Sequence, residues 1–184
     1  MKYRFVLIIW IFSVVALTGG EKDQYHFFGA SISGFSGSGI TYRYRRADNY
    51  CIKFAGYAFY NDKNTEEKDD ETSVYDFGLE YQKIIFRKSF LLFNFSTGLE
   101  LLNKAEPKSG YDKIETNRFL AGVGFNIDIY TKFNPNYPDI VMFFGIGERY
   151  YHQHEIKWDN SRQMNERKSK GLELTGTAGL GVEF

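Results

Sequence analysis

The chain has 184 residues, with 23 lysines and arginines against 23 aspartates and glutamates, so its formal net charge is +0. A neutral chain has no global basic field to attract nucleic acid, and a charged fraction of 25% with only 3 prolines argues against a disordered chain. The 18 phenylalanines, 14 tyrosines and 18 glycines together favour an all-β protein.

The first element in chain order is an export signal. Lys2 and Arg4 precede a continuous apolar run from Phe5 to Leu17, and small residues follow at positions 18–20. A basic start, a short apolar stretch and small residues are typical of a secretory signal peptide. We therefore expect residues 1–20 to be a signal peptide and residues 21–184 to form one exported domain. The alternative is an uncleaved anchor, for which the apolar run is short.

From Tyr25 onward, apolar and polar residues alternate with a period of two, which is the pattern of β-strands. Eight such segments can be drawn, and the three prolines fall between them. The segments are 25–33, 39–46, 50–60, 73–86, 89–102, 116–130, 139–152 and 171–184. We expect about eight antiparallel strands in one meander, with ten as the alternative. Segments 61–72, 103–115 and 153–170 are expected to be long loops at one end.

Glycines indicate which face of these strands points inward. Gly78, Gly145, Gly179 and Gly181 lie in the polar register, interleaved with charged residues. Inside a narrow barrel, a residue without a side chain makes room for a long charged neighbour, whereas on a water-exposed face it only weakens the strand. The polar face is therefore expected inside and the apolar face outside, against lipid. A secreted lipocalin-like carrier, the alternative, would have an apolar lumen.

The last strand carries a more specific pattern, because Leu180, Val182 and Phe184 alternate with polar or small residues. Here the chain resembles the small OmpA/OmpX-type outer-membrane barrels, whose last strand of alternating apolar residues ends in an aromatic residue. The resemblance implies a closed antiparallel up-and-down transmembrane β-barrel in the bacterial outer membrane. It also implies that the barrel-assembly machinery reads this C-terminal pattern. We expect Tyr44, Tyr50, Tyr81 and Phe184 to ring one side of the apolar band.

The inward register of the expected barrel is rich in both signs of charge. Its charged residues are Arg43, Arg45, Lys53, Asp76, Glu80, Glu100, Arg118, Asp128, Arg149, Glu173 and Glu183. Buried charges must be paired, and an eight-stranded barrel has room for little besides its own side chains. We expect a salt-bridged interior that does not conduct; a proton or ion path is the alternative.

Function is expected to reside in the outer loops, in a structural, adhesion or surface-recognition role with no cofactor and no metal. Five cations between Gln153 and Lys170 suggest contact with lipopolysaccharide phosphates. A host or other surface ligand is a further candidate partner. The alternative is a lipid A-modifying hydrolase or acyltransferase, with a catalytic site at His152 or His154 and with Glu155, Ser161 and Glu173 nearby in sequence.

Overall fold

The computed structural model describes seven stretches of the protein. They are residues 24–34, 36–47, 49–65, 68–108, 111–131, 138–159 and 162–184. The predicted signal peptide, residues 1–20, lies outside these ranges. No helix among the described residues is long and apolar enough to cross a membrane.

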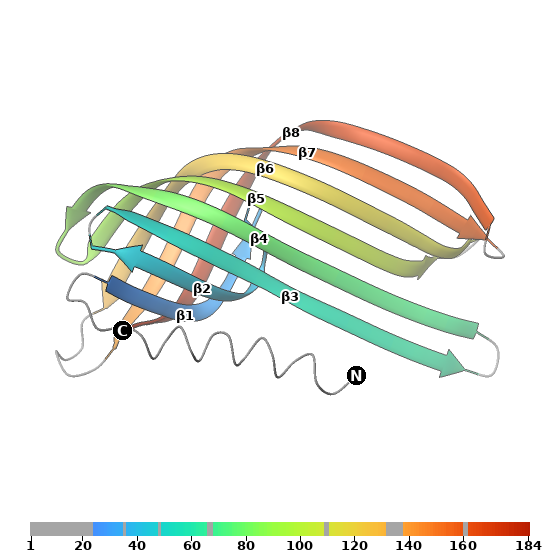
Figure 1. The fold of residues 1–184 in the computed structure, drawn as a ribbon, viewed down its shortest axis with the longest axis horizontal. Coiled ribbons are helices and arrows are strands. Elements are labelled where there is room, and N and C mark those ends of the chain that lie inside the picture. The colour runs from blue at the N-terminus through green and yellow to red at the C-terminus, as the bar shows by residue number, and fades with distance from the viewer. Residues whose placement is uncertain are drawn as a thin grey trace.

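Eight antiparallel strands follow one another along the chain and close into a barrel, with the last strand pairing back onto the first (Figure 1). The strands are β1 Gln24–Ser33, β2 Gly39–Arg46, β3 Tyr50–Thr65, β4 Lys68–Lys88, β5 Leu91–Lys108, β6 Tyr111–Thr131, β7 Asp139–Asp159 and β8 Arg162–Glu183. The predicted all-β fold and the predicted count of eight strands are confirmed, and the alternative of ten strands is wrong.

The pairing is staggered around the barrel. A row of directly paired residues that starts at Tyr44 on β2 passes through β3 to β7 and reaches Leu174 on β8. In the other direction Tyr44 pairs with His26, whose backbone exchanges two hydrogen bonds with Phe184. One circuit therefore shifts the ladder by ten residues, from 174 to 184. A stagger of this kind tilts the strands against the barrel axis, and eight strands leave a lumen that side chains can fill.

The two faces of the barrel have opposite character. On the outside, Phe77 is 50% exposed, Phe125 47% and Leu180 55%, whereas Lys53 and Glu80 are 0% exposed in the lumen. A water-soluble barrel has its apolar side chains inside, so this distribution is the reverse of one. Charged and polar side chains therefore fill much of the lumen, whereas the lipocalin-like alternative predicts an apolar one.

One end of the lumen nevertheless holds an apolar cluster, where β1 begins and β8 ends. Its members are Phe27, Ile84, Leu92, Tyr130, Val141 and Phe143. A Cβ added to Gly181 would lie 2.4 Å from the Phe27 ring, and one added to Gly179 would lie 2.2 Å from the Phe143 ring. Glycine was expected to make room for charged side chains; at these two positions it makes room for aromatic rings.

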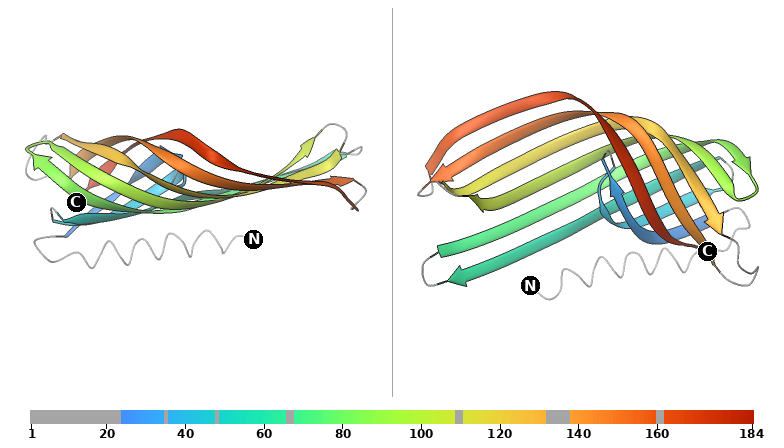
Figure 2. Two further views of the ribbon diagram at one scale, coloured as in Figure 1. Left: turned by 90° about the horizontal axis from the view of Figure 1, so that it is seen from above. Right: turned by 180° about the vertical axis from the view of Figure 1, so that it is seen from behind.

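Six of the eight strands continue beyond the closed ring. β1 ends at Ser33, opposite Thr177 of β8, and the pairing of β2 with β3 ends at Ile40 and Gly56. Beyond these levels β3 to β8 continue as an open, curved sheet (Figures 1 and 2). The end of the β3–β4 hairpin separates from this sheet, because the pairing of β4 with β5 ends at Ser73 and Ala105. We call this part the projecting sheet; it comprises residues 57–65, 68–75, 101–108, 111–119, 149–159 and 162–176. The remainder of the strands is the ring.

The segments expected to be long loops are therefore mainly strands. Residues 61–72, 103–115 and 153–170 lie largely in the β3–β4, β5–β6 and β7–β8 hairpins, for example with Lys104 opposite Thr116 and Gln153 opposite Ser169. These segments have polar residues in both registers, so the hydrophobic alternation that identifies a strand is weak. Pairing with the neighbouring strand decides their conformation instead.

Candidate functional site

Three buried ion pairs lie in the lumen of the ring. The pairs are Arg43 with Asp128, Lys53 with Glu80 at 2.5 Å, and Arg45 with Glu183 at 2.5 Å. Each of these side chains is at most 5% exposed. A charge removed from water is tolerated only when a partner and hydrogen bonds replace the lost hydration, and each pair joins residues that are distant in sequence.

Glu80 is the centre of the polar lumen. Besides Lys53, its carboxylate accepts hydrogen bonds from the Gln82 amide at 2.8 Å and from the Asn126 amide at 2.7 Å. Asn126 also donates to the Ser96 hydroxyl at 2.6 Å. One carboxylate thus connects residues of β3, β4 and β6, and through Asn126 also β5.

The turn between β1 and β2 is held by carboxylates of the lumen. The Gly37 N–H donates to Glu100 Oε2 at 3.3 Å, and the Ser38 N–H donates to Asp76 Oδ2 at 3.1 Å. Glu100 and Asp76 were expected to belong to a network of salt bridges. Both lie on the inner face as expected, but the hydrogen-bond donors in contact with them are backbone amides.

The same turn rests directly on the inner face of β4. A Cβ added to Gly78 would lie 2.0 Å from the carbonyl carbon of Ser36, so only glycine allows this approach. On the other side of the lumen, the Arg149 guanidinium donates to the carbonyl oxygen of Gly34. The β1–β2 turn therefore spans the lumen between β4 and β7, at the level where the projecting sheet begins.

The remaining predicted interior charges, Arg118, Arg149 and Glu173, lie near the β1–β2 turn, where the projecting sheet begins. Glu173 accepts hydrogen bonds from Arg149 at 2.8 Å and from Arg118 at 3.1 Å, and the Arg118 guanidinium lies 5.2 Å from the centroid of the Tyr151 ring. The structure thus places all eleven predicted interior residues on the inner face: six in buried pairs, three in this cluster and two against the turn.

Aromatic side chains meet on the outside of the ring at the end where β1 begins. Ring centroids are separated by 6.2 Å for His26–Phe184, 5.6 Å for His26–Tyr44, 6.4 Å for Tyr44–Tyr50 and 6.0 Å for Tyr50–Tyr81. The expected set of four aromatic residues therefore forms one continuous band. His26 on β1 links Tyr44 to Phe184 and was not predicted to belong to the band. Its position in the outward register, opposite Tyr44, could have indicated this.

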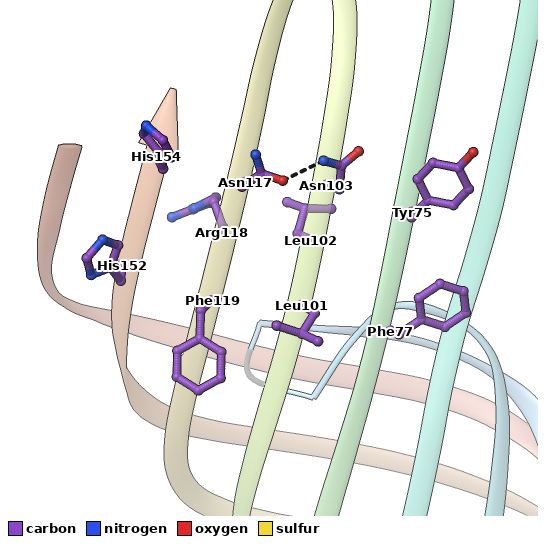
Figure 3. A pocket seen from close by; sticks show the side chains of 10 residues that line it. All are labelled: Tyr75, Phe77, Leu101, Leu102, Asn103, Asn117, Arg118, Phe119, His152 and His154. Carbon is purple, nitrogen blue, oxygen red and sulfur yellow. Dashed lines mark hydrogen bonds between the residues drawn. The ribbon is translucent and has the colours of Figure 1, made fainter. Parts of the chain in front are cut away.

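His152 and His154 lie on the outer face of β7, at one end of a groove that crosses β4 to β7 (Figure 3). The groove has a volume of about 380 Å³. Its outward-pointing lining residues are Tyr75, Phe77, Leu101, Asn103, Asn117, Phe119, His152 and His154. Sequence reasoning singled out the two histidines but not the groove, because its residues come from four strands.

Two neighbouring rows of directly paired residues build this groove and continue onto β8. The first row is Phe77, Leu101, Phe119, His152 and Lys170. The second row is Tyr75, Asn103, Asn117, His154 and Lys168. Apolar and aromatic members lie toward β4 and basic members lie on β7 and β8. The Asn103 amide donates to the Asn117 oxygen at 2.5 Å, which fixes the middle of the second row.

Glu166 is the carboxylate next to these basic residues. Its oxygen lies 2.9 Å from His154 Nε2 and 2.7 Å from Lys168 Nζ. The hydrogen bond from Lys168 lowers the pKa of Glu166 below its ordinary value. Glu173, which the catalytic hypothesis grouped with the histidines, lies on the inner face of the sheet, so it cannot orient either outward-pointing ring. Ser161 lies outside the described residues.

The described residues contain no cluster of three or more histidine, cysteine, aspartate or glutamate side chains that could hold a metal ion. The side chains at positions 62–71, which carry the acidic run between β3 and β4, lie outside the described part of the structure.

One carboxylate of the ring points outward. Glu148 lies between Val123 and Leu174 in its row and is exposed. Its neighbour Arg149, which was predicted to lie inside, has the opposite, inward register. Glu148 is thus a charged residue on an otherwise apolar part of the outer face.

Searches against protein-family models, curated proteins and solved structures found no match to this chain.

Proposed function

We propose that this chain is an exported β-barrel of the bacterial outer membrane with a non-conducting interior and a structural, adhesion or surface-recognition role through its projecting sheet. The observation that carries the proposal is the reversed distribution of side chains, with large apolar residues exposed around the ring and ion pairs in its lumen. Soluble monomers rarely expose contiguous apolar surface of this extent, whereas barrels in lipid require it.

The aromatic band of Tyr44, Tyr50, Tyr81 and Phe184 supports the same placement. Tyrosine and phenylalanine girdles mark the level where the apolar band of a membrane barrel meets the polar headgroups. The apolar outward register of Leu180 and Val182 supports recognition by the barrel-assembly machinery.

The closed interior supports a role other than transport. Three buried ion pairs, the apolar cluster and the β1–β2 turn occupy the lumen at successive levels, so no continuous water path is expected. In planar bilayers the refolded protein should give no conductance at the nanosiemens scale. Stable channels of that size would contradict the non-conducting assignment.

Membrane fractionation and heat-modifiable mobility on gels test the localisation. The wild type should fractionate with the outer membrane and migrate differently before and after boiling. Leu99→Arg, on the outer face of the ring, should lose most of the folded band, because a cation facing mid-bilayer lipid costs about 2–4 kcal/mol. Ser73→Arg, on the outward register of the projecting sheet, is the matched control and should keep that band. Recovery of wild-type protein in the soluble fraction without detergent would refute the proposal.

A further inference from the structure

The outer-face groove changes character from one side to the other. Phe77, Leu101 and Phe119 follow one another on β4, β5 and β6, and they are 50%, 60% and 43% exposed. Leu79 and Leu99, which pair in the next outward-facing row toward the ring, extend the same apolar surface. In a bilayer this surface would contact acyl chains rather than water.

The same row ends in cations. His152 and Lys170 lie opposite each other on β7 and β8, directly beyond Phe119. Neither has an ion-pair partner among the described residues. In the adjacent row, His154 and Lys168 share the single carboxylate of Glu166. Four basic side chains with one carboxylate therefore stand beside an apolar surface.

Next to the apolar part, on the same strands β4 to β6 but one outward row farther from the ring, the second row offers neutral hydrogen-bonding groups. Asn103, Asn117 and Tyr75 all point outward into the groove (Figure 3). Amides and a phenol can donate to and accept from hydroxyl groups, while a simple phospholipid headgroup offers few of these. The apolar part borders the neutral groups on β4 to β6 and the basic residues on β7 and β8. Acyl chains, hydroxyl groups and phosphates on one molecule, which match these three parts, are the features of a phosphorylated glycolipid.

We propose that this groove binds a phosphorylated glycolipid of the outer leaflet, of the lipid A type, with acyl chains on Phe77, Leu101 and Phe119 and a phosphate at His152 and Lys170. The site rests on the proposed outer-membrane location. Lysine is a common phosphate ligand, and basic pockets at the membrane surface bind anionic headgroups.

The register decides which cations of the β7–β8 hairpin take part. Lys168 and Lys170 point outward with the groove, whereas Arg167, between Lys168 and Glu166 in sequence, has the opposite register. Arg167 is exposed and carries the same charge, so it is a matched control on the same strand.

The test uses the full refolded barrel in phosphatidylcholine nanodiscs, titrated with bisphosphorylated lipid A and followed by the NMR signals of the histidine rings. Lys170→Gln and His152→Gln should each weaken binding about fivefold, the size expected for one partly exposed ionic contact, and Arg167→Gln should leave it within about twofold. Glu166→Gln should tighten binding, because it releases His154 and Lys168 from their shared carboxylate.

Several results would overturn the assignment. Equal weakening by Arg167→Gln would show general charge attraction instead of a site. Equal binding of dephosphorylated lipid A would refute the phosphate contact, and equal binding of phosphatidylglycerol would refute the glycolipid assignment. Heat-modifiable mobility of the same samples separates the two proposals: a folded membrane barrel without saturable lipid A binding contradicts only this inference, whereas loss of that mobility in the wild type contradicts the outer-membrane barrel.

Discussion

The ring and the projecting sheet use the same ion-pair chemistry in different surroundings. In the ring, the paired side chains of Lys53 and Glu80 are both 0% exposed. On the projecting sheet, Lys113 Nζ lies 2.7 Å from Glu115 Oε1, but these two side chains are 38% and 28% exposed. Breaking a buried pair leaves a charge without hydration, while water replaces either partner of an exposed pair. The comparison indicates that the ring depends on particular side chains and that the projecting sheet depends on its backbone ladder.

The largest expected effect is in the lumen. Glu80→Ala leaves Lys53 without its anion and removes an acceptor from Gln82 and Asn126, so it should destabilise the barrel by about 3–5 kcal/mol. Urea unfolding of the refolded protein in detergent micelles measures this change.

Glu115→Ala is the control on the projecting sheet, where loss of the exposed pair with Lys113 should cost at most about 1 kcal/mol. Equal losses for the two variants would contradict the distinction between ring and projecting sheet.

Gly78 tests the contact between β4 and the β1–β2 turn, which lies where the ring meets the projecting sheet. Gly78→Ala places a methyl group against the Ser36 carbonyl, which should displace the β1–β2 turn and cost about 1–3 kcal/mol. Limited proteolysis within residues 34–38 should become faster in parallel. In Gly176→Ala the new Cβ meets only the Gly145 oxygen at 3.5 Å, an ordinary contact, so this variant should keep wild-type stability and protease resistance. Faster cleavage in both variants would argue against a specific role of the turn.

The smallest effect concerns the outer face of the ring. Glu148→Leu should stabilise the protein in lipid bilayers by about 1 kcal/mol, because a carboxylate facing hydrocarbon is unfavourable though less so than a cation. Glu115→Leu, the same exchange on the outward register of the projecting sheet, should give no such gain. Unfolding in bilayers compares them, and a loss of stability in Glu148→Leu would show that this position is not in contact with lipid.

The fold of the ring was predictable because each strand there has one apolar and one polar face. Phe77, Phe125 and Leu180 take the outward register that the alternation predicted, and the strand count followed from counting such segments. The apolar cluster around Phe27 and Phe143 was not predicted, because it depends on Gly181 and Gly179, which only the register places opposite these rings.

The projecting sheet and the groove were less accessible from sequence. Residues 103–115 and 153–170 have polar residues in both registers, so nothing local distinguishes a strand from a loop. The five cations between Gln153 and Lys170 were treated as one group, but strand register separates Lys168 and Lys170 from Arg167. The groove depends on alignment across β4 to β8, which no single segment encodes.

The shortness of β1 and β2 has a consequence for any lipid around the protein. Above Gly56 on β3 and ahead of Gly176 on β8, the described backbone has a neighbouring strand on one side only. Hydrocarbon cannot accommodate unsatisfied backbone N–H and C=O groups, so hydrated headgroups must descend to the ends of β1 and β2. On the opposite side of the barrel, the row of directly paired residues that starts at Ile40 on β2 reaches Phe119 on β6. Because the strands are staggered, Phe119 lies farther along the barrel axis toward the projecting sheet than Ile40, and the apolar surface extends with it. The bilayer is therefore expected to be thinner beside β1 and β2 than beside β6, with a lopsided dip around each copy of the protein.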